Sequence, residues 1–384
     1  MIKSLSMPIV SMLLFISLST GCKNTAGNTR EGIAVGAIRW DAWHQPTSDL
    51  SQGGYGGPVM AVQRSLSPKK YQTRAPFFAS IVSDTSILIN GYTQEIVDQE
   101  IAYARAGGLD YWAFLLYKSG TEMSQGLELY LSSEHKTELN FCAIASRRNF
   151  SGELENPDGI PYMIRLMKEP GYQKVLDNRP LLYFFRPDSS WVEDVGGIEK
   201  ARHLIDSLRR QAILEGFGDP YIAVIHHNID LAVSMADMMG ADALSDYAKW
   251  GDGGYKGTPY SQLTSVARAF WDSCAATGKE VVPLVTTGWN RLPRIERPVP
   301  WEKSWQKPGQ NIDRYFALPT PEEIAAHLQE GCDWVDRYPE SAPARAILIY
   351  AWNEHDEGGW LCPTLNEDGS VNDSRLTALS GIKH

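Results

Sequence analysis

Three carboxylates stand within four positions of the sequence, directly after a run of apolar residues. The segment 349–360 reads IYAWNEHDEGGW. In a turn that leaves a strand, Glu354 and Glu357 can face one cavity, where like charges push their pKa values apart, so that one carboxyl group keeps its proton while the other ionises. Cleavage of a glycosidic bond needs such a pair, because an acid must protonate the leaving oxygen while a carboxylate acts near the anomeric carbon. The pattern therefore indicates a glycoside hydrolase with Glu354 and Glu357 as its catalytic residues.

Other interpretations of this carboxylate cluster stay open. The acids could cap the helix that follows, or they could hold a calcium ion, since Gly358 and Gly359 would let the loop fold round a cation. The sequence contains no His-Glu-x-x-His motif, phosphate-binding glycine loop or Gly-x-Ser-x-Gly elbow. Metalloenzymes, nucleotide-sugar transferases of the Rossmann type and serine hydrolases thereby lose support, and we expect no metal and no cofactor.

The elements that must position these residues follow from the order of apolar runs. Apolar runs that alternate with helical patterns imply a parallel sheet whose outer face is covered. We therefore predict an α/β fold, a single (β/α)8 TIM barrel with long βα loops; a doubly wound open sheet is the alternative, because periodicity does not show whether the sheet closes. The eight predicted strands are Ile33–Trp40, Tyr111–Tyr117, Leu139–Ser146, Pro180–Arg186, Tyr221–His226, Ala243–Asp246, Val281–Thr287 and Ala346–Trp352.

Three helices carry clear boundary signals. Thr93–Ala106 opens on a capping residue and is followed by two glycines, and Ile198–Glu215 has apolar residues at helical spacing. Thr320–Tyr338 opens with a cap, a proline and a capping glutamate.

Polar and aromatic side chains gather where the predicted strands end, which is the functional face of such a barrel. Arg147, Arg148 and Arg186 could recognise a carboxylate or sulfate on an acidic glycan, or could pair with the barrel's own acids. His226 and His227 should point to opposite sides of a strand, which makes them a poor metal pair. The candidate substrate-binding residues are Trp40, Asp41, His44, Tyr117, Arg147, Arg186, His227, Asp246, Trp289, Asn353, His355 and Asp356.

The aromatic composition agrees with a sugar-binding face. The chain has 12 Trp and 17 Tyr against 11 Phe, an excess of rings with a polar group, which suit half-exposed positions. Trp112 and Trp352 are expected in the core. The tryptophans expected towards one face, where rings can stack on sugars, are Trp40, Trp43, Trp250, Trp289, Trp301, Trp305 and Trp360.

The N-terminus resembles a bacterial lipoprotein signal. Met7–Leu18 is apolar, and small residues follow up to Cys22. We predict a signal peptide at 1–21, lipid on Cys22, a polar tether at 22–32 and the catalytic domain at 33–384; an ordinary signal peptide is the alternative. The protein would then be a membrane-anchored lipoprotein of the outer membrane, on its periplasmic face or on the cell surface, and a monomer.

The net charge restricts the kinds of partner that the protein can bind, and the cysteine content bears on whether it contains a disulfide. The formal net charge of −10 excludes a nucleic-acid binder built on a basic surface. Cysteines in an exported protein can pair, but spacing does not assign a disulfide, and burial as small apolar residues is the preferred interpretation. They are Cys142, Cys274, Cys332 and Cys362.

From about Ile33 to Pro363 the chain resembles the glycoside hydrolase family 99-like barrels, which include endo-α-mannosidases and the WbsX-type proteins. The segment 352–358 (WNEHDEG) is similar to the family's Trp/Phe-Asn-Glu-Trp-x-Glu-Gly signature. Weaker matches that agree in order and spacing are 106–114 (AGGLDYWAF), 167–172 (MKEPGY) and 178–184 (NRPLLYF).

The resemblance implies a role for each residue of the signature. Glu354 would act as a base on the sugar 2-hydroxyl and Glu357 as acid/base on the leaving oxygen, through a 1,2-anhydro intermediate, with Asn353 orienting the substrate. His355 replaces the family's aromatic residue, and His355 or Asp356 could share the proton transfer. A glycan is the expected substrate; a WbsX-type glycosyltransferase and a non-catalytic glycan-binding lipoprotein are the alternatives.

Overall fold

The structure is a computed structural model that describes residues 32–43, 57–151, 159–250, 256–302, 306–307 and 310–382. The predicted signal peptide, Cys22, all but the last residue of the tether, His44 and Trp305 lie outside the described residues.

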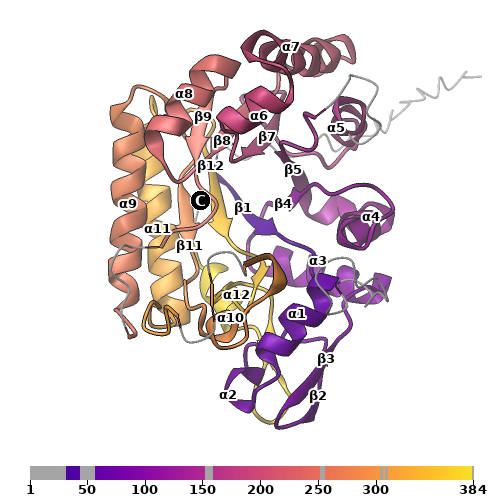
Figure 1. The fold of residues 1–384 in the computed structure, drawn as a ribbon, viewed down its shortest axis with the longest axis vertical. Helices are drawn as coiled ribbons and strands as arrows, with labels where there is room; N and C mark the ends of the chain where they lie inside the picture. Colours follow the sequence, from indigo (N-terminus) through magenta and orange to yellow (C-terminus); the bar gives the residue numbers. More distant parts are fainter. Residues whose placement is uncertain are drawn as a thin grey trace, which may run out of the picture. The chain divides into compact units, whose positions relative to one another are not determined.

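Eight parallel strands of the described chain form a closed ring (Figure 1). The seventh strand has two pieces, β10 (Glu280–Val281) and β11 (Leu284–Thr286): β10 pairs with β9, and β11 pairs with β12. Since β12 also pairs with β1, the ring closes, which confirms the predicted (β/α)8 barrel and excludes the doubly wound sheet. The other strands are β1 (Ala34–Arg39), β4 (Tyr111–Leu115), β5 (Asn140–Ser146), β7 (Arg179–Phe185), β8 (Tyr221–Ile225), β9 (Ala243–Ser245) and β12 (Ala346–Tyr350).

A helix follows each strand of the ring. Figure 1 shows helices of this set around the outside of the sheet. The predicted boundaries are confirmed: the Thr93 side chain accepts a hydrogen bond from the Ile96 N–H at 3.3 Å, and Thr320 and Glu323 form a capping box. These helices are α3 (Gln94–Ala106), α4 (Gln125–Ser132), α5 (Ile160–Met167), α7 (Ile198–Leu214), α8 (Ile229–Met239), α9 (Tyr260–Ala276), α11 (Pro321–Arg337) and α12 (Ser374–Leu379). None of the described helices is long and apolar enough to cross a membrane.

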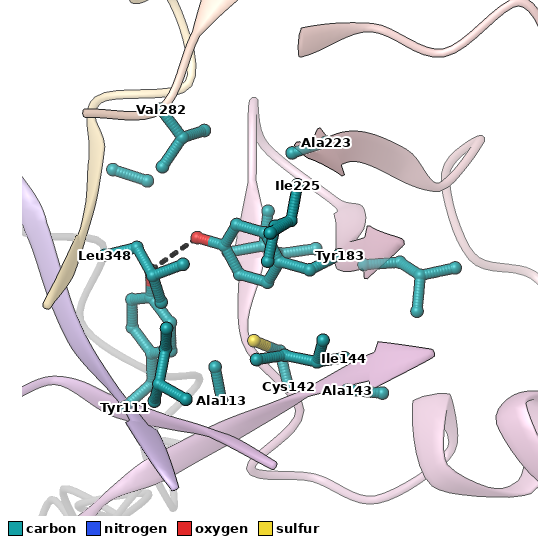
Figure 2. Close-up of a cluster of buried hydrophobic side chains, with 14 of the residues drawn as sticks. Tyr111, Ala113, Cys142, Ala143, Ile144, Tyr183, Ala223, Ile225, Val282 and Leu348 are labelled. Carbon is teal, nitrogen blue, oxygen red and sulfur yellow. Dashed lines mark hydrogen bonds between the residues drawn. The ribbon is translucent and has the colours of Figure 1, made fainter. Parts of the chain in front are cut away.

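The core of the barrel is packed with side chains from the strands (Figure 2). The Tyr111 and Tyr183 hydroxyls are 2.9 Å apart, and Tyr111 also donates to the Ile347 carbonyl at 2.9 Å. A Cβ on Gly36 would lie 2.2 Å from the Tyr111 ring, so only glycine leaves room for that ring. The four described cysteines are buried and free, as expected for small apolar residues.

The connections between the strands and helices of the ring contain structure that the sequence did not predict. A hairpin and two helices after β1 pack around Trp40 and Trp43 and form a second apolar cluster with them. Both tryptophans come just after the end of β1. The additional elements are α1 (Gly57–Leu66), α2 (Lys69–Gln72), β2 (Ala79–Ser83), β3 (Ser86–Ile89), β6 (Lys174–Val175), α6 (Ser189–Asp194), α10 (Leu292–Glu296), β13 (Asn353–Glu354), β14 (Gly359–Trp360), β15 (Thr364–Leu365) and β16 (Val371–Asn372).

Candidate active site

The two candidate glutamates lie on one short hairpin that leaves the eighth strand of the ring. Glu354 is on β13, and Glu357 is in the turn between β13 and β14. The turn is anchored to the segment that follows β11, because the Asn290 N–H donates to the Glu357 backbone carbonyl at 2.7 Å. Gly358 has φ +85°, and a Cβ there would lie 2.5 Å from the Asn290 nitrogen, so the turn requires glycine. Both carboxylates are thereby fixed at the carboxyl end of the barrel.

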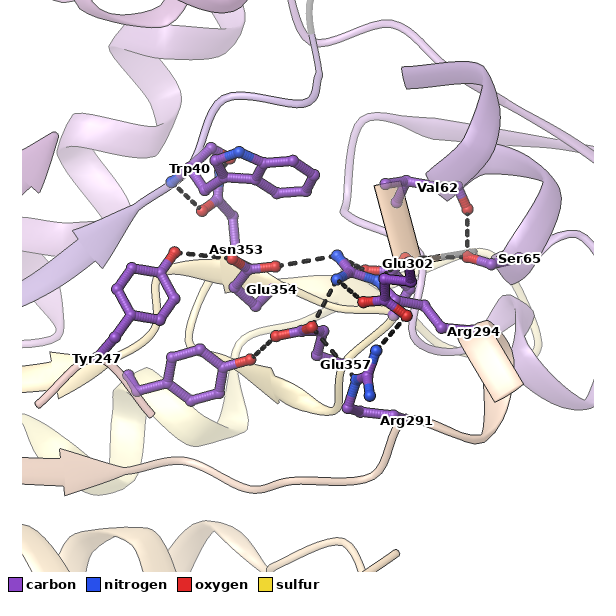
Figure 3. A network of polar contacts seen from close by, with 12 residues as sticks. Trp40, Val62, Ser65, Tyr247, Arg291, Arg294, Glu302, Asn353, Glu354 and Glu357 are labelled. Atoms are coloured by element: carbon purple, nitrogen blue, oxygen red, sulfur yellow. Dashed lines mark hydrogen bonds and ion pairs between the residues drawn. The ribbon is translucent and has the colours of Figure 1, made fainter. Parts of the chain in front are cut away.

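Each glutamate is held by a separate tyrosine (Figure 3). The Tyr247 hydroxyl donates to Glu354 Oε1 at 2.9 Å. The Tyr350 hydroxyl donates to Glu357 Oε2. Both tyrosines come from the ends of strands or the residues just beyond them, so the barrel itself positions the pair.

One arginine connects the two glutamates. Arg294 on α10 is buried, and its guanidinium lies 2.5 Å from Glu357 Oε1 and 3.2 Å from Glu354 Oε2. Arg291 also approaches Glu357, with Nε 3.3 Å from Oε1. Neither arginine was predicted from the sequence, because both lie in the long loop after the seventh strand. Their separation by one helical turn is the only signal in the sequence.

Two further carboxylates complete the network around Arg294. Its Nε lies 2.7 Å from Asp356 Oδ2, its Nη2 donates to Asp356 Oδ1 at 3.0 Å, and its Nη1 lies 3.2 Å from Glu302 Oε1. Glu302 also pairs with Arg291. Four buried carboxyl groups therefore share two guanidinium groups, so not every carboxyl group has a cation of its own.

Burial, more than the neighbouring charges, alters the protonation of two glutamates in this network, Glu354 and Glu302. Burial, and next the charge of Glu357, raise the pKa of Glu354 to about 8, against the opposing effect of Arg294. Burial also raises the pKa of Glu302, although Arg294 and Arg291 oppose it. Glu354 therefore holds a proton near neutral pH, while its neighbour Glu357 faces two guanidinium groups.

The residues between the glutamates are bound within the protein. Asp356 accepts hydrogen bonds from Arg294 and, at 3.2 Å, from the Ser65 hydroxyl. His355 is fully buried, with Nδ1 2.7 Å from the Arg74 carbonyl oxygen, and its ring stacks on Trp360. Burial lowers the pKa of His355 to about 3, so the imidazole is neutral at physiological pH. Neither side chain is exposed to solvent.

Asn353 joins the hairpin to the first strand. Its amide oxygen accepts from the Trp40 N–H at 2.9 Å and its amide nitrogen donates to the Trp40 carbonyl at 2.7 Å. Both polar atoms of the Asn353 side-chain amide therefore bond to the backbone of Trp40. Trp40 in turn donates to the Tyr117 hydroxyl at 2.8 Å, and Asp41 pairs with the buried Arg39.

Aromatic side chains flank the carboxylates on two sides. On one side Trp301, which is 41% exposed, meets Trp40 edge-on at 5.6 Å, and the Arg294 guanidinium lies within 5.6 Å of both rings. On the other side Trp289 lies 5.8 Å from Tyr350 and 5.7 Å from Trp250, which is 43% exposed. Exposed rings beside a carboxylate pair suit the apolar faces of sugars.

The remaining tryptophan predictions have mixed outcomes. Trp112 and Trp352 are fully buried, as predicted. Trp43 and Trp360 are also buried, at 3% and 6% exposure, and pack against His355 instead of presenting a free face. The preference for one face therefore holds only for the tryptophans beside the carboxylates.

The histidine prediction was wrong in its geometry. His226 and His227 stack with ring centroids 4.8 Å apart, because β8 ends at Ile225 and strand alternation no longer applies. His226 is buried, with Nδ1 3.1 Å from the Asn228 carbonyl oxygen, whereas His227 is exposed and contacts Trp250 at 5.2 Å.

The charged candidates differ in their partners. Arg147 pairs with Asp194 and donates to the Ser190 hydroxyl at 2.9 Å. Asp246 is buried and pairs with Lys249. Arg186 is exposed at the end of β7. The site as a whole thus combines a carboxylate pair, a shared arginine and exposed aromatic rings.

The described residues hold no metal site, and a cavity in them lies away from the carboxylates. In the part of the chain that the structure describes, no group of three or more His, Cys, Asp or Glu residues is arranged to hold a metal ion. A cavity of about 640 Å³ lies against α9 and α11, lined by Thr264, Arg268 and Glu323 among others, and none of the candidate site residues lines it.

Comparison with known proteins supports the fold. No protein-family model matches the sequence, and no curated protein matches it. The chain is similar to two solved structures of the GH99 endo-α-mannosidase from Bacteroides thetaiotaomicron, at 13% identity and TM-scores of 0.51 and 0.52. The alignments cover 90% of this chain and 94% and 95% of the mannosidase chains. The chain therefore has the (β/α)8 fold of these glycosidases.

Proposed function

We propose that the protein is a glycoside hydrolase that cleaves a glycosidic bond in a polysaccharide or oligosaccharide, with Glu354 and Glu357 as the catalytic pair. One observation carries the proposal: two glutamates at the carboxyl end of a glycosidase-type barrel share Arg294 and are each held by a tyrosine. The exposed Trp250 and Trp301 beside them supply surfaces on which sugar rings can stack.

The electrostatics favour different roles for the two glutamates. Glu354, with its raised pKa, is the group that can give a proton to the leaving oxygen near neutral pH. Glu357, in contact with Arg294 and Arg291, is the carboxylate that acts at the anomeric centre, directly or through the 2-hydroxyl. The oxygen of a water molecule then bonds to the anomeric carbon, and the proton that this water loses returns to Glu354, which restores both carboxyl groups to their starting state. This order is the reverse of the one that the family resemblance implies.

A screen of glycans tests the proposed function. Purified protein is incubated with a panel of plant, algal, host and microbial glycans, and new reducing ends are measured. We expect cleavage of at least one glycan class by the natural protein and none by the Glu354→Gln/Glu357→Gln double variant. Binding of glycans without cleavage would contradict the proposal and identify a glycan-binding protein, and transfer from an activated sugar without hydrolysis would identify a glycosyltransferase.

The pH dependence of the reaction tests the role of Glu354. Below its pKa of about 8 the carboxyl group is protonated and can act as the acid; as the pH rises through that value the proton is lost. We therefore expect kcat/KM to fall as the pH rises through about 8, measured from about pH 5 to about pH 10. In Glu354→Gln the residual activity should lack this alkaline fall. A rise in kcat/KM across pH 8 would instead make Glu354 the base.

The N-terminal sequence supports a second, separate proposal, that the protein is anchored to the outer membrane by lipid on Cys22. The support is the apolar run Met7–Leu18 followed by small residues and Cys22. We expect the protein expressed in a bacterium to incorporate labelled palmitate and to enter the detergent phase on partitioning. Cys22→Ser should abolish both, while Cys142→Ser, which changes a buried cysteine of the barrel, should leave the labelling intact. Labelling that survives Cys22→Ser would contradict the anchor.

A further inference from the structure

Three basic side chains follow adjacent strands at the carboxyl end of the barrel. Arg148 comes two residues after the end of β5, Arg186 comes directly after β7, and His227 comes two residues after β8. The strands are in register there, since Ser146 pairs with Phe185 and Phe185 with Ile225. Because neighbouring strands lie about 4.8 Å apart, the three residues form one arc along the rim. We call Arg148, Arg186 and His227 the basic arc.

The two arginines of the basic arc have no partners of their own. Within the described chain, neither guanidinium makes a hydrogen bond or ion pair, and both side chains are exposed. The neighbouring Arg147 is different, because it pairs with Asp194. Unlike Arg147, Arg148 and Arg186 are therefore available to bind a ligand.

The nearby carboxylates are already used. Asp188 accepts hydrogen bonds from the Trp191 N–H at 3.0 Å and from the Ser190 hydroxyl at 2.6 Å, which caps α6. Asp246 pairs with the buried Lys249. Within the described chain, neither of these acids makes an ion pair with Arg148 or Arg186.

The basic arc is electrostatically linked to the proposed catalytic pair. The positive charge of Arg148 acts on Tyr117, whose pKa is raised to about 12 by burial and, in smaller part, by the charge of Glu354. Burial and then the charge of Arg186 lower the pKa of His227.

His227 also contacts Trp250, which continues through Trp289 to the tyrosine that holds Glu357. A glycan on the exposed rings would therefore extend past the basic arc.

We propose that the basic arc binds the carboxylate or sulfate group of an acidic sugar, so that the substrate is an anionic glycan. Guanidinium groups bind such planar or tetrahedral anions through paired hydrogen bonds, and exposed histidine can add another donor. The placement fits this role, because in the described chain the two guanidinium groups that contact the catalytic carboxylates, Arg291 and Arg294, are already paired with them. Arg148 and Arg186 therefore supply the positive charge that an anionic chain can bind beside them. This inference rests on the proposed glycosidase function.

An array of paired glycans tests the basic arc. It carries uronate-containing and sulfated oligosaccharides, each beside its carboxyl-reduced or desulfated counterpart, and it is probed with Glu357→Gln to prevent cleavage. We expect the bound glycans to be anionic, to lose about 10-fold or more in affinity when neutralised, and to bind more weakly at high salt. The two kinds of pair show whether carboxylate or sulfate is recognised.

Variants separate the basic arc from overall charge. Arg148→Ala/Arg186→Ala, in the same Glu357→Gln background, should bind the anionic member about 10-fold or more weakly and leave the neutral member unchanged. Arg202→Ala/Arg210→Ala, which removes two exposed charges from α7, should leave the preference intact. Arg148→Lys/Arg186→Lys should retain part of it.

The failure of this inference can be told apart from the failure of the proposed function. Equal affinity for the two members of each pair, or an anionic preference that survives Arg148→Ala/Arg186→Ala, would overturn the basic arc. Cleavage of a neutral glycan at the same rate by the natural protein and by Arg148→Ala/Arg186→Ala would do the same and leave the hydrolase standing. Absence of both binding and cleavage with every glycan would overturn the hydrolase as well.

Discussion

Glu357→Gln is expected to lower kcat by about 10²- to 10⁴-fold while the substrate still binds. The glutamine has the same shape: its carbonyl oxygen can still accept from Arg294 and its amide nitrogen can donate to the Tyr350 hydroxyl oxygen, so the hairpin should keep its conformation. It carries no charge, however, and cannot act at the anomeric centre. The measurement is single-turnover cleavage of a glycan found in the screen, together with calorimetric binding of the same glycan.

A matched variant distinguishes a catalytic role from a general effect of the carboxylate network. Glu302→Gln changes one carboxyl group that contacts the same two arginines, but no tyrosine of the described chain holds Glu302, and it lies outside the hairpin. We expect a much smaller loss of kcat for Glu302→Gln. An unchanged kcat in Glu357→Gln, or equal losses in the two variants, would remove Glu357 from the catalytic pair.

The barrel could be predicted from the sequence because its signals are local and repeated. Each strand is an apolar run of about the right length, and the caps at Thr93 and Thr320 lie next to the helices they begin. These signals act over a few residues, so periodicity and capping chemistry suffice. Closure of the sheet was the one step that required the structure, because it depends on the division of the seventh strand into β10 and β11.

The site was only partly predictable, for a different reason. Glu354 and Glu357 stand out because they follow a strand at a fixed spacing, but Arg294 meets them across 60 and 63 residues of chain. Its helix, α10, has five residues and contains a proline, so it gives little helical pattern. The burial of His355 and Asp356 likewise depends on Arg74, Ser65 and Arg294, which are distant in sequence. Tertiary contacts of this kind leave no periodic signal.

Strand ends are the other place where the pattern fails. Alternation assigns His226 and His227 to opposite faces only while the strand continues, and β8 stops one residue earlier. The same limit explains why Arg147 and Arg148 are adjacent in the sequence and yet differ, the first paired with Asp194 and the second free of any acid in the described chain. The residues that bind ligands in a barrel come from these ends, so their side chains have to be read from the structure.

Arg294 should be the residue whose loss damages the site most. Arg294→Met keeps much of the apolar stem but leaves the buried Glu354, Asp356 and Glu357 without their shared guanidinium. Removing one partner of a buried ion pair costs about 3–5 kcal/mol, because the other charge stays buried without compensation. We therefore expect the free energy of unfolding, measured by denaturant titration, to fall by about that amount, and glycan cleavage to be lost.

The pH dependence of this loss separates uncompensated charge from lost packing. Without Arg294 the pKa values of the buried carboxylates should rise further in the folded protein than in the unfolded chain, so the folded state binds more protons and stability falls as the pH rises. The difference between Arg294→Met and the natural protein should therefore be larger at about pH 8 than at about pH 5. Arg294→Lys, which keeps one charge but not the planar fork, should lie between them. A loss of stability that is the same at both pH values would show that packing, and not the carboxylates, depends on Arg294.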